Sequence, residues 1–225
     1  MNSNCTFNIT VPTNKGLETI VYDGNTLTVT CVTPPTVCLI PTNTDDTEYF
    51  VDGETIKRVR KLKHLDGSDR WYHNDELHRI SGPAIVLSDG TEEWYQHGER
   101  HRVDGPAIKY PDGIEEWYQH GERHRVDGPA IIRSSGSDEW YFEGKLHRVD
   151  GPACTFSDGT EEWRVEGKLH RVGGPTIKSP DGTEHWYQHG KLHRVGGPAT
   201  IEYRDGKLHR VATYEHGVLI TEIKC

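Results

Sequence analysis

Apolar and polar positions follow a pattern that recurs every 23 residues over most of this chain. Every tryptophan occupies the same position of the pattern: Trp71, Trp94, Trp117, Trp140, Trp163 and Trp186. No residue is inserted or deleted between these copies. A fixed period of roughly 20 to 50 residues is typical of repeat arrays, in which each copy buries apolar surface only by stacking on its neighbours. The pattern therefore predicts an array of small, similar units.

The first turn signal in each copy lies just after the tryptophan. In the copy that begins at Trp94 this signal is His97-Gly98, and glycine supplies the positive φ that a two-residue hairpin turn requires. A turn at that place sets Trp94 opposite His101 across the hairpin. It also sets a glutamate opposite an arginine on the other face of the sheet. The expected pairs are Glu93 with Arg102, Glu116 with Arg125, Glu139 with Arg148 and Glu162 with Arg171.

The second turn signal joins one copy to the next and is Asp112-Gly113 in the third copy. Counting outward from it sets Ile108 opposite Trp117, and the same count in other copies gives a stripe of tryptophan and isoleucine on one face. We interpret this stripe as the core. Gly105-Pro106 lies between His101 and Ile108, and proline cannot donate a hydrogen bond to a strand, so a bulge or corner is expected at each Gly-Pro.

The chain divides into three parts on this pattern. Residues 1–47 lack tryptophan, and apolar segments on both sides of Asp23-Gly24-Asn25 predict a hairpin. We interpret residues 1–47 as a β element that caps the array, with a dimerisation or effector element as the alternative. Residues 48–216 form the array of six full copies, with degenerate copies at its ends; Glu48 replaces the tryptophan in the first. Residues 217–225 predict a C-terminal edge strand.

These elements predict an all-β fold, an elongated single-layer array of antiparallel β-hairpins with a small N-terminal β cap. Composition supports a thin core, since 33% of the 225 residues are hydrophobic and the mean hydropathy is -0.75. Large aromatic rings can sustain such a layer with few aliphatic side chains. No apolar run is long enough to span a membrane, and the N-terminus lacks the pattern of a signal peptide. We therefore expect a soluble protein in the cytoplasm.

Charge indicates the kind of partner. The net charge is -9, which disfavours direct binding of nucleic acid. Acidic side chains expected on the surface are candidates for contact with a partner: Glu92, Glu115, Glu122 and Glu161. One dense basic run, Lys57 to Lys63, interrupts the acidic chain, and its Lys57, Arg58, Arg60 and Lys61 are candidates for an acidic partner. A solvated strand face is the alternative interpretation of the run.

No motif of catalysis stands at a unique position of the chain. Histidines recur at one position of every copy, from His78 to His193, but equivalent positions lie two strands, or about 9.6 Å, apart. Zinc holds its ligands at about 2.0–2.3 Å, so neighbouring copies cannot share an ion. We expect no metal, no cofactor and no enzyme activity, and a structural role for each histidine beside its tryptophan. Departures from the repeat, His185, Arg164 and Cys154, are the only other places where a special site could form.

The 23-residue hairpin unit with an aromatic pair before its first turn resembles the MORN repeat, in particular the variety in bacterial proteins named as YwqK-like antitoxins. The resemblance covers about residues 48–216. The segment His-Arg-x-x-Gly-Pro-Ala departs from the simpler Gly-x-Gly of typical MORN units and is similar to arrays in phages and large DNA viruses. This resemblance implies a viral or prophage origin, and with it residence in the cytoplasm of the host cell.

The expected function is that of a non-catalytic module that binds a protein with a basic surface; an oligomer is compatible with this expectation. A repeat array presents a long, rigid surface, and an acidic face suits a basic groove. Together with the resemblance, this suggests a phage-encoded inhibitor of a host defence enzyme that handles nucleic acid, such as a CRISPR effector. The alternative is a cellular MORN-type scaffold or antitoxin-like partner protein.

Overall fold

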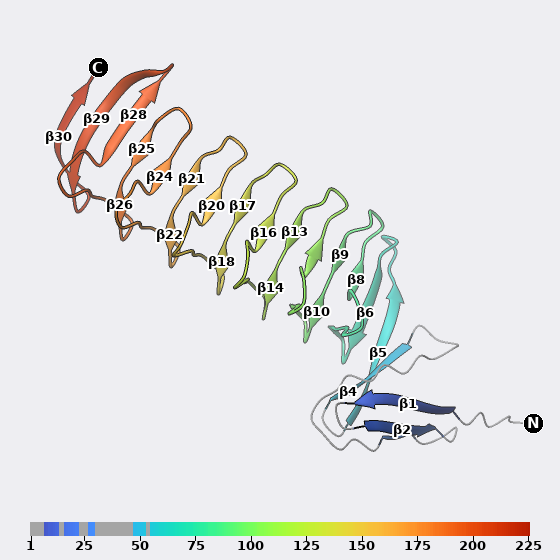
Figure 1. Cartoon of the computed structure of the whole chain (residues 1–225). Helices are drawn as coiled ribbons and strands as arrows, with labels where there is room; N and C mark the ends of the chain where they lie inside the picture. The colour runs from blue at the N-terminus through green and yellow to red at the C-terminus, as the bar shows by residue number, and fades with distance from the viewer. Residues whose placement is uncertain (1–6, 14–15, 23–26, 30–46, 53–54) are drawn as a thin grey trace, which may run out of the picture.

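The computed structural model describes residues 7–13, 16–22, 27–29, 47–52 and 55–225. The described residues form β-strands joined by turns and contain no helix. Successive copies lie one after another along a long antiparallel sheet, so the molecule is elongated (Figure 1). The all-β, elongated hairpin array predicted from the 23-residue pattern is therefore confirmed.

Longer strands stand before and after the repeated copies. The N-terminal sheet contains β1 (Phe7–Thr13), β2 (Gly16–Tyr22) and β3 (Leu27–Val29), paired antiparallel in that order. The turn expected at Asp23-Gly24-Asn25 lies outside the described residues. The array begins with β4 (Thr47–Asp52), β5 (Thr55–Lys63), β6 (Asp69–His73) and β7 (Glu76–Leu77). It closes with β28 (Thr200–Arg204), β29 (Lys207–Glu215) and β30 (Val218–Lys224).

Between these ends each copy contributes four strands of two residues. They are β8 (Ile85–Val86), β9 (Glu92–Glu93), β10 (Tyr95–Gln96) and β11 (Glu99–Arg100); β12 (Ile108–Lys109), β13 (Glu115–Glu116), β14 (Tyr118–Gln119) and β15 (Glu122–Arg123); β16 (Ile131–Ile132), β17 (Asp138–Glu139), β18 (Tyr141–Phe142) and β19 (Lys145–Leu146); β20 (Cys154–Thr155), β21 (Glu161–Glu162), β22 (Arg164–Val165) and β23 (Lys168–Leu169); and β24 (Ile177–Lys178), β25 (Glu184–His185), β26 (Tyr187–Gln188) and β27 (Lys191–Leu192).

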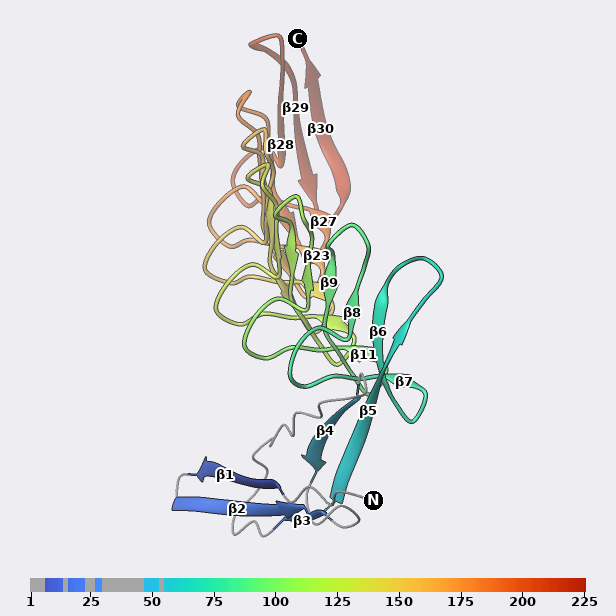
Figure 2. The same cartoon turned by 90° about the vertical axis from the view of Figure 1, so that its right-hand side faces the viewer.

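The first two strands of each copy build one long sheet. β4, β5, β6, β8, β9, β12 and β13 pair in that order, and the sheet continues in the same way through β16, β17, β20, β21, β24, β25 and β28 to β29 and β30. β4 and β30 lie at opposite ends in both views (Figures 1 and 2). The last two strands of each copy form a small hairpin of their own, such as β10 with β11.

The small hairpins carry the first predicted turn. In the turn between β10 and β11 both central residues have positive φ, 52° at His97 and 75° at Gly98, which is the geometry of a type I′ turn. His101 donates its backbone N–H to the carbonyl of Trp94 at 3.1 Å. The predicted pairing of Trp94 with His101 is confirmed.

The second turn holds three residues rather than two, and this changes the register. Tyr110 donates its backbone N–H to the carbonyl of Ile114 at 2.9 Å, and Ile108 pairs with Glu116. The predicted pairing of Ile108 with Trp117 is therefore wrong by one residue. Because side chains alternate between faces along a strand, Trp117 and Ile108 lie on opposite faces of the sheet.

The core is a line of small and branched residues rather than a stripe of tryptophan and isoleucine. The alanine of each Gly-Pro-Ala segment is fully buried (Ala84, Ala107, Ala130, Ala153 and Ala199), and Thr176 replaces it in one copy. Ile108 and Ile131 are 1% exposed on the other face. Trp71, Trp163 and Trp186 are buried, and the three central tryptophans are half-buried. The tryptophans therefore cover the alanines as an outer layer.

Each Gly-Pro lies in a loop that leaves the sheet and returns to it. Residues 102–106 stand outside the strands, whereas the carbonyl of Ala107 accepts the N–H of Trp94 at 2.8 Å. The N–H of Ala107 in turn donates to Glu116 at 2.8 Å. The expected bulge or corner is thus a five-residue loop, repeated in every copy.

Candidate functional site

The repeated arginine of each loop is held within its own copy. The guanidinium of Arg125 lies 4.0 Å from the ring centroid of Trp117, and its Nε donates to Asp127 at 3.2 Å. Its Nη1 donates to the carbonyl of Pro129 at 3.1 Å. Equivalent stacks form at Arg79, Arg102, Arg148, Arg171 and Arg194, at 3.7–4.2 Å from their tryptophans. These arginines are packed as cation–π partners and form part of the fold.

The predicted ion pairs between Glu93 and Arg102, and their equivalents, are wrong. The chain leaves the sheet at Arg102, so the residue that reaches Glu93 is Arg100, at 3.1 Å. In the next copy Glu116 accepts bonds from Tyr118 at 2.8 Å and from Arg123 at 3.1 Å. The carboxylates of this face are internal acceptors that join the long sheet to the small hairpins.

The repeated histidines connect one copy to the next. Nδ1 of His101 accepts the backbone N–H of His120 at 3.2 Å, and the two rings lie 4.6 Å apart. The same bond recurs from His78, His124, His147, His170 and His193. Burial and the neighbouring His120 lower the pKa of His101. Each of these rings therefore accepts a backbone bond from the next hairpin turn, as expected of histidines with a structural role.

The three residues that depart from the repeat, Cys154, Arg164 and His185, are each held by neighbouring groups. Cys154 takes the place of a core isoleucine, and burial, with Glu139 and Glu162 nearby, raises the pKa of its thiol to about 12. At neutral pH it is a thiol and a poor nucleophile. Arg164 pairs with Glu162 at 2.9 Å, and burial lowers the pKa of His185. Among the described residues no group of three or more His, Cys, Asp or Glu could hold a metal ion.

Three of the four acidic candidates share one row on the long sheet. Residues paired across the sheet share a face, and the pairs in succession are Glu92, Lys109, Glu115, Ile132, Asp138, Thr155, Glu161, Lys178 and Glu184. We call the five carboxylates of this series the acidic row. They recur every second strand, or about every 9.6 Å. Glu92, Glu115 and Glu161 are half-buried rather than fully exposed.

The fourth candidate, Glu122, lies apart from the acidic row. It is exposed on β15, beside the turn of a small hairpin. Equivalent positions are Glu76 and Glu99 before it and Lys145, Lys168 and Lys191 after it. This position therefore changes from acidic to basic halfway along the array, where Glu143 and Glu166 stand in the turns beside the new lysines and Lys145 pairs with Glu166 at 3.7 Å.

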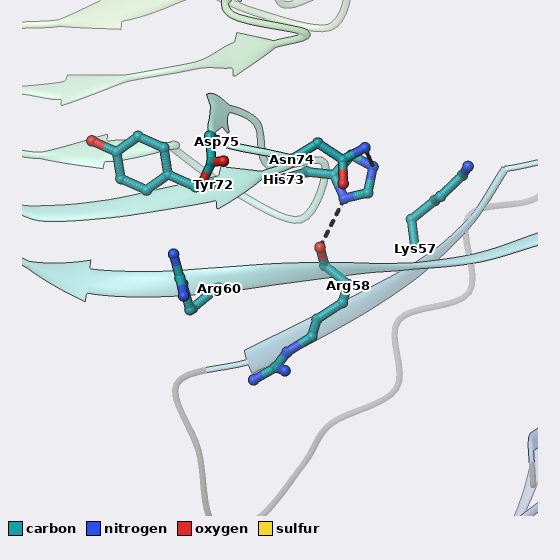
Figure 3. A pocket seen from close by; sticks show the side chains of 7 residues that line it. All are labelled: Lys57, Arg58, Arg60, Tyr72, His73, Asn74 and Asp75. Carbon is teal, nitrogen blue, oxygen red and sulfur yellow. Dashed lines mark hydrogen bonds between the residues drawn. The ribbon is translucent and has the colours of Figure 1, made fainter.

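The basic run lies on β5, and its residues lie in two different environments. Lys61 pairs with Asp69 at 3.0 Å and lies 5.3 Å from the ring of Trp71. Lys57, Arg58 and Arg60 line a pocket of about 470 Å³ whose other walls are Tyr72, His73, Asn74 and Asp75 (Figure 3). His73 donates from Nδ1 to the carbonyl of Arg58 at 2.8 Å, which fixes β5 against the end of β6. The structure thus brings three of the four basic candidates to one pocket.

A row of exposed valines was not recognised in the sequence. The loops of residues 102–106 and their equivalents present Val103, Val126, Val149, Val172 and Val195, which are 74–82% exposed. Asp104, Asp127 and Asp150 follow the first three, with side chains 86–87% exposed. The signal was an apolar residue kept at one position of an otherwise polar loop. The exposed valine recurs in five successive copies, whereas the equivalent Ile80 of the copy before them packs against Val59 and Trp71.

Two further findings bear on identity. In the described part of the chain no helix is long and apolar enough to cross a membrane. Neither the comparison with protein-family models nor the comparison with curated proteins finds a match to this chain.

Proposed function

We propose that this protein is a non-catalytic binding module whose array docks onto a protein with a basic surface. The observation that carries the proposal is the acidic row, in which one carboxylate recurs at each copy on one face of a continuous sheet. Lys109 and Lys178 lie between the carboxylates of the acidic row. The five carboxylates outnumber these two ammonium groups, so this part of the sheet keeps a net negative charge. Regularly spaced charge on a rigid support favours recognition of an extended basic partner and raises the rate of association.

The valine loops support the same function. A contact surface needs apolar anchors that exclude water as well as charge, and charged side chains alone contribute little at an exposed rim. Val126 with Asp127 offers both in one loop. A phage-encoded inhibitor of a host enzyme that handles nucleic acid fits this chemistry, since such an enzyme carries a basic groove. A cellular scaffold or antitoxin-like partner protein is the alternative, and it would use the same surface.

The test compares matched charge reversals. The tagged chain captures partners from a host lysate, and the captured protein is identified by mass spectrometry, purified and titrated against four variants. One carries Glu92→Lys, Glu115→Lys and Glu161→Lys; a second carries Lys57→Glu, Arg58→Glu and Arg60→Glu. A third carries Glu122→Lys alone. The control carries Glu143→Lys, Glu166→Lys and Glu215→Lys, which changes the charge as much as the first variant but away from the acidic row.

We expect the first variant to lose at least tenfold in affinity, and the loss to shrink at high salt because screening already weakens the parent. The control and the second variant should bind like the parent. Loss only in the second variant would assign docking to the basic pocket and contradict the acidic row. If every variant is folded by circular dichroism and binds like the parent, electrostatic docking is excluded.

A further inference from the structure

The backbone bond that each repeated histidine accepts depends on the protonation of its ring. Nδ1 of His101 accepts the N–H of His120 at 3.2 Å, and this N–H makes no other bond to a described residue. A neutral imidazole can accept a hydrogen bond at one nitrogen, whereas a protonated imidazole is a donor at both. The bond between these two copies therefore exists only while Nδ1 of His101 carries no proton.

In four copies the turn residue that donates this bond is itself a histidine. The ring centroids lie 4.7 Å apart for His78 and His97, 4.6 Å for His101 and His120, 4.5 Å for His170 and His189, and 4.4 Å for His193 and His216. His78 also contacts the ring of His73, at 5.8 Å. We call the other three contacts the histidine pairs. Two protonated rings at these distances repel each other, because like charges in close contact are unfavourable.

A carboxylate takes the place of the second ring at one contact between copies. Nδ1 of His147 accepts the N–H of Glu166 at 3.3 Å, and Oε1 of Glu166 lies 3.3 Å from the same nitrogen. A protonated His147 can donate from Nδ1 to this carboxylate, so the two copies stay in contact without the backbone bond. Lys145 also pairs with Glu166, at 3.7 Å. This contact is a matched comparison for the histidine pairs within the same array.

Other charged groups face the histidine pairs. The side chains two residues before each histidine lie beside the glycine of the next turn: Glu99 at Gly121, Lys168 at Gly190 and Lys191 at Gly217. The turns of the histidines' own hairpins hold His97, Glu166 and His189, and Glu215 precedes His216. In the described part of the chain no carboxylate forms an ion pair with a ring of the histidine pairs. The carboxylate of Glu99 offsets part of the repulsion at the first pair, whereas the two lysines add to it at the others.

The first histidine pair favours neutral rings in the folded state. Burial, and then the neighbouring His120, lower the pKa of His101, although Glu99 raises it. The ordinary pKa of histidine is about 6.5. A lowered pKa in the folded state gives a contribution to stability that is complete above about pH 6.5 and is lost as the pH falls below it. The direction agrees with the loss of the accepting nitrogen on protonation.

We propose that the histidine pairs are acid-sensitive contacts, which release neighbouring small hairpins from one another below about pH 6.5, where imidazole gains its proton. The contact between His147 and Glu166 stays closed under the same conditions. Bonds of the long sheet join backbone groups that do not titrate, so the sheet persists while the row of small hairpins (Figure 1) loosens. The array is then stiff at neutral pH and more flexible in an acidified medium. This inference does not depend on the proposed function.

A glycine amide reports whether each contact is closed. Gly121, Gly190 and Gly217 donate their N–H to the preceding hairpin at 2.8–3.0 Å, and Gly167 does so at 2.9 Å beside His147. Hydrogen exchange of these four amides is followed by NMR at about pH 7.5 and about pH 5 and is corrected for the direct effect of pH on the exchange rate. We expect protection of the first three to fall at least about tenfold at the lower pH, the factor that corresponds to about 1.4 kcal/mol of lost contact. Protection of Gly167 should change much less.

Two reciprocal variants test the role of the turn residue. His120→Glu gives the first histidine pair a carboxylate like that of Glu166, so Gly121 should keep its protection at about pH 5. Glu166→His removes the carboxylate from His147, so Gly167 should lose its protection there. The control, His209→Gln, removes a titrating ring outside these contacts and should leave all four amides like those of the parent.

Three outcomes would overturn the proposal. Unchanged protection of Gly121, Gly190 and Gly217 in the parent at both pH values would show that protonation does not open these contacts. An equal loss at Gly167 would show that acid acts without regard to the turn residue, as would a loss at Gly121 that persists in His120→Glu. A loss of the β-sheet signal in circular dichroism of the parent at about pH 5 would mean unfolding of the whole array rather than release of the small hairpins.

Discussion

At the residue scale, one contact explains why the sequence Arg-Val-Asp-Gly-Pro recurs. A side-chain carbon added at Gly128 would lie 2.6 Å from Cζ of Arg125, closer than real atoms approach. On its other side the guanidinium faces the ring of Trp117 at 4.0 Å. The glycine therefore leaves space for the arginine to lie flat against the tryptophan. Its φ is not in the left-handed region, so this space, rather than an unusual backbone angle, accounts for the glycine.

This contact predicts a coupled pair of substitutions. Gly128→Ala should lower the free energy of unfolding by about 1–3 kcal/mol, the usual cost of forcing extra volume into a packed site. In the Arg125→Ala background the same change should cost little, because the side chain that blocks the new methyl is gone. Denaturant melts of the four chains in a double-mutant cycle give the coupling directly. Additive effects would mean that Gly128 is kept for another reason.

Residue-level prediction from the sequence succeeded where alternation alone decides the contact. Trp94 and His101 follow from a two-residue turn and the period of a strand. The partner of Arg102 did not follow, because nothing in the alternation of side chains reveals that the chain leaves the sheet at that residue. Asp104, two positions on, was the visible alternative acceptor. The acidic row was recognised at three positions, but its half-buried state depends on neighbouring strands that the pattern does not place.

At the scale of the element, each copy is two hairpins whose turns differ. In the small hairpin both His120 and Gly121 have positive φ, whereas at the second turn of that copy only Gly136 does. A two-residue type I′ turn requires positive φ at both positions. The composition of the turns carried this information: a proline precedes Asp112-Gly113, and three-residue turns commonly end in a glycine in the left-handed region. Reading that turn as two residues caused the one-residue error in register, and with it the wrong placement of tryptophan and isoleucine on one face.

In three copies a tyrosine (Tyr95, Tyr118 or Tyr141) joins the two hairpins and makes the fold sensitive to alkali. Tyr141 donates its hydroxyl to Glu139 at 2.9 Å. Burial, with the bond to Glu139, raises the pKa of Tyr141 to about 12. The ordinary value is about 10, so the folded state favours the neutral phenol. This contribution to stability is complete below about pH 10 and is lost as the pH rises toward about 12.

We therefore expect the free energy of unfolding to fall steeply between about pH 10 and 12. Tyr141→Phe should be less stable than the parent by about 1.5–3 kcal/mol at neutral pH, the usual value of a hydrogen bond to a charged group, and should lose less on going to pH 12. Urea melts at a series of pH values measure both effects. Tyr203→Phe, whose hydroxyl bonds no described residue, is the control and should keep the parent's slope. An equal slope in Tyr141→Phe would contradict the assignment.

At the scale of the whole molecule, contacts are local, since each copy bonds only to its neighbours along the sheet. Elongation followed from the sequence because a strict period and a thin apolar composition leave no other way to bury the alanines. Residues 217–225 were expected to form a C-terminal edge strand, and β30 lies within that range. What the sequence could not supply is how far the side chains of β30 are exposed, because that depends on which strands neighbour it in space. Which strands lie beside an edge strand is decided by the folded sheet and not by the sequence of that strand.

Removing one whole copy should shorten the molecule and leave the fold intact. Deleting residues 118–140 joins equivalent positions of two copies, so every remaining bond between copies has a counterpart in the parent. Small-angle scattering should give a longest dimension reduced by about 9.6 Å, two strand spacings. The parent's radius of gyration should exceed the ~17 Å of a compact chain of this size. A deleted chain that unfolds, or a parent with the compact radius, would show that the copies are not independent units.

The absence of any insertion between Trp71 and Trp186 has a consequence for how such a chain can change. An in-frame gain or loss of 23 residues inside the array alters reach alone, because the new joint repeats one already present. The length of the array then changes in whole copies, while the backbone bonds that join one copy to the next stay the same. The affinity of a partner that contacts several copies would depend on the number of copies, and the affinity of a partner that contacts a single copy would not.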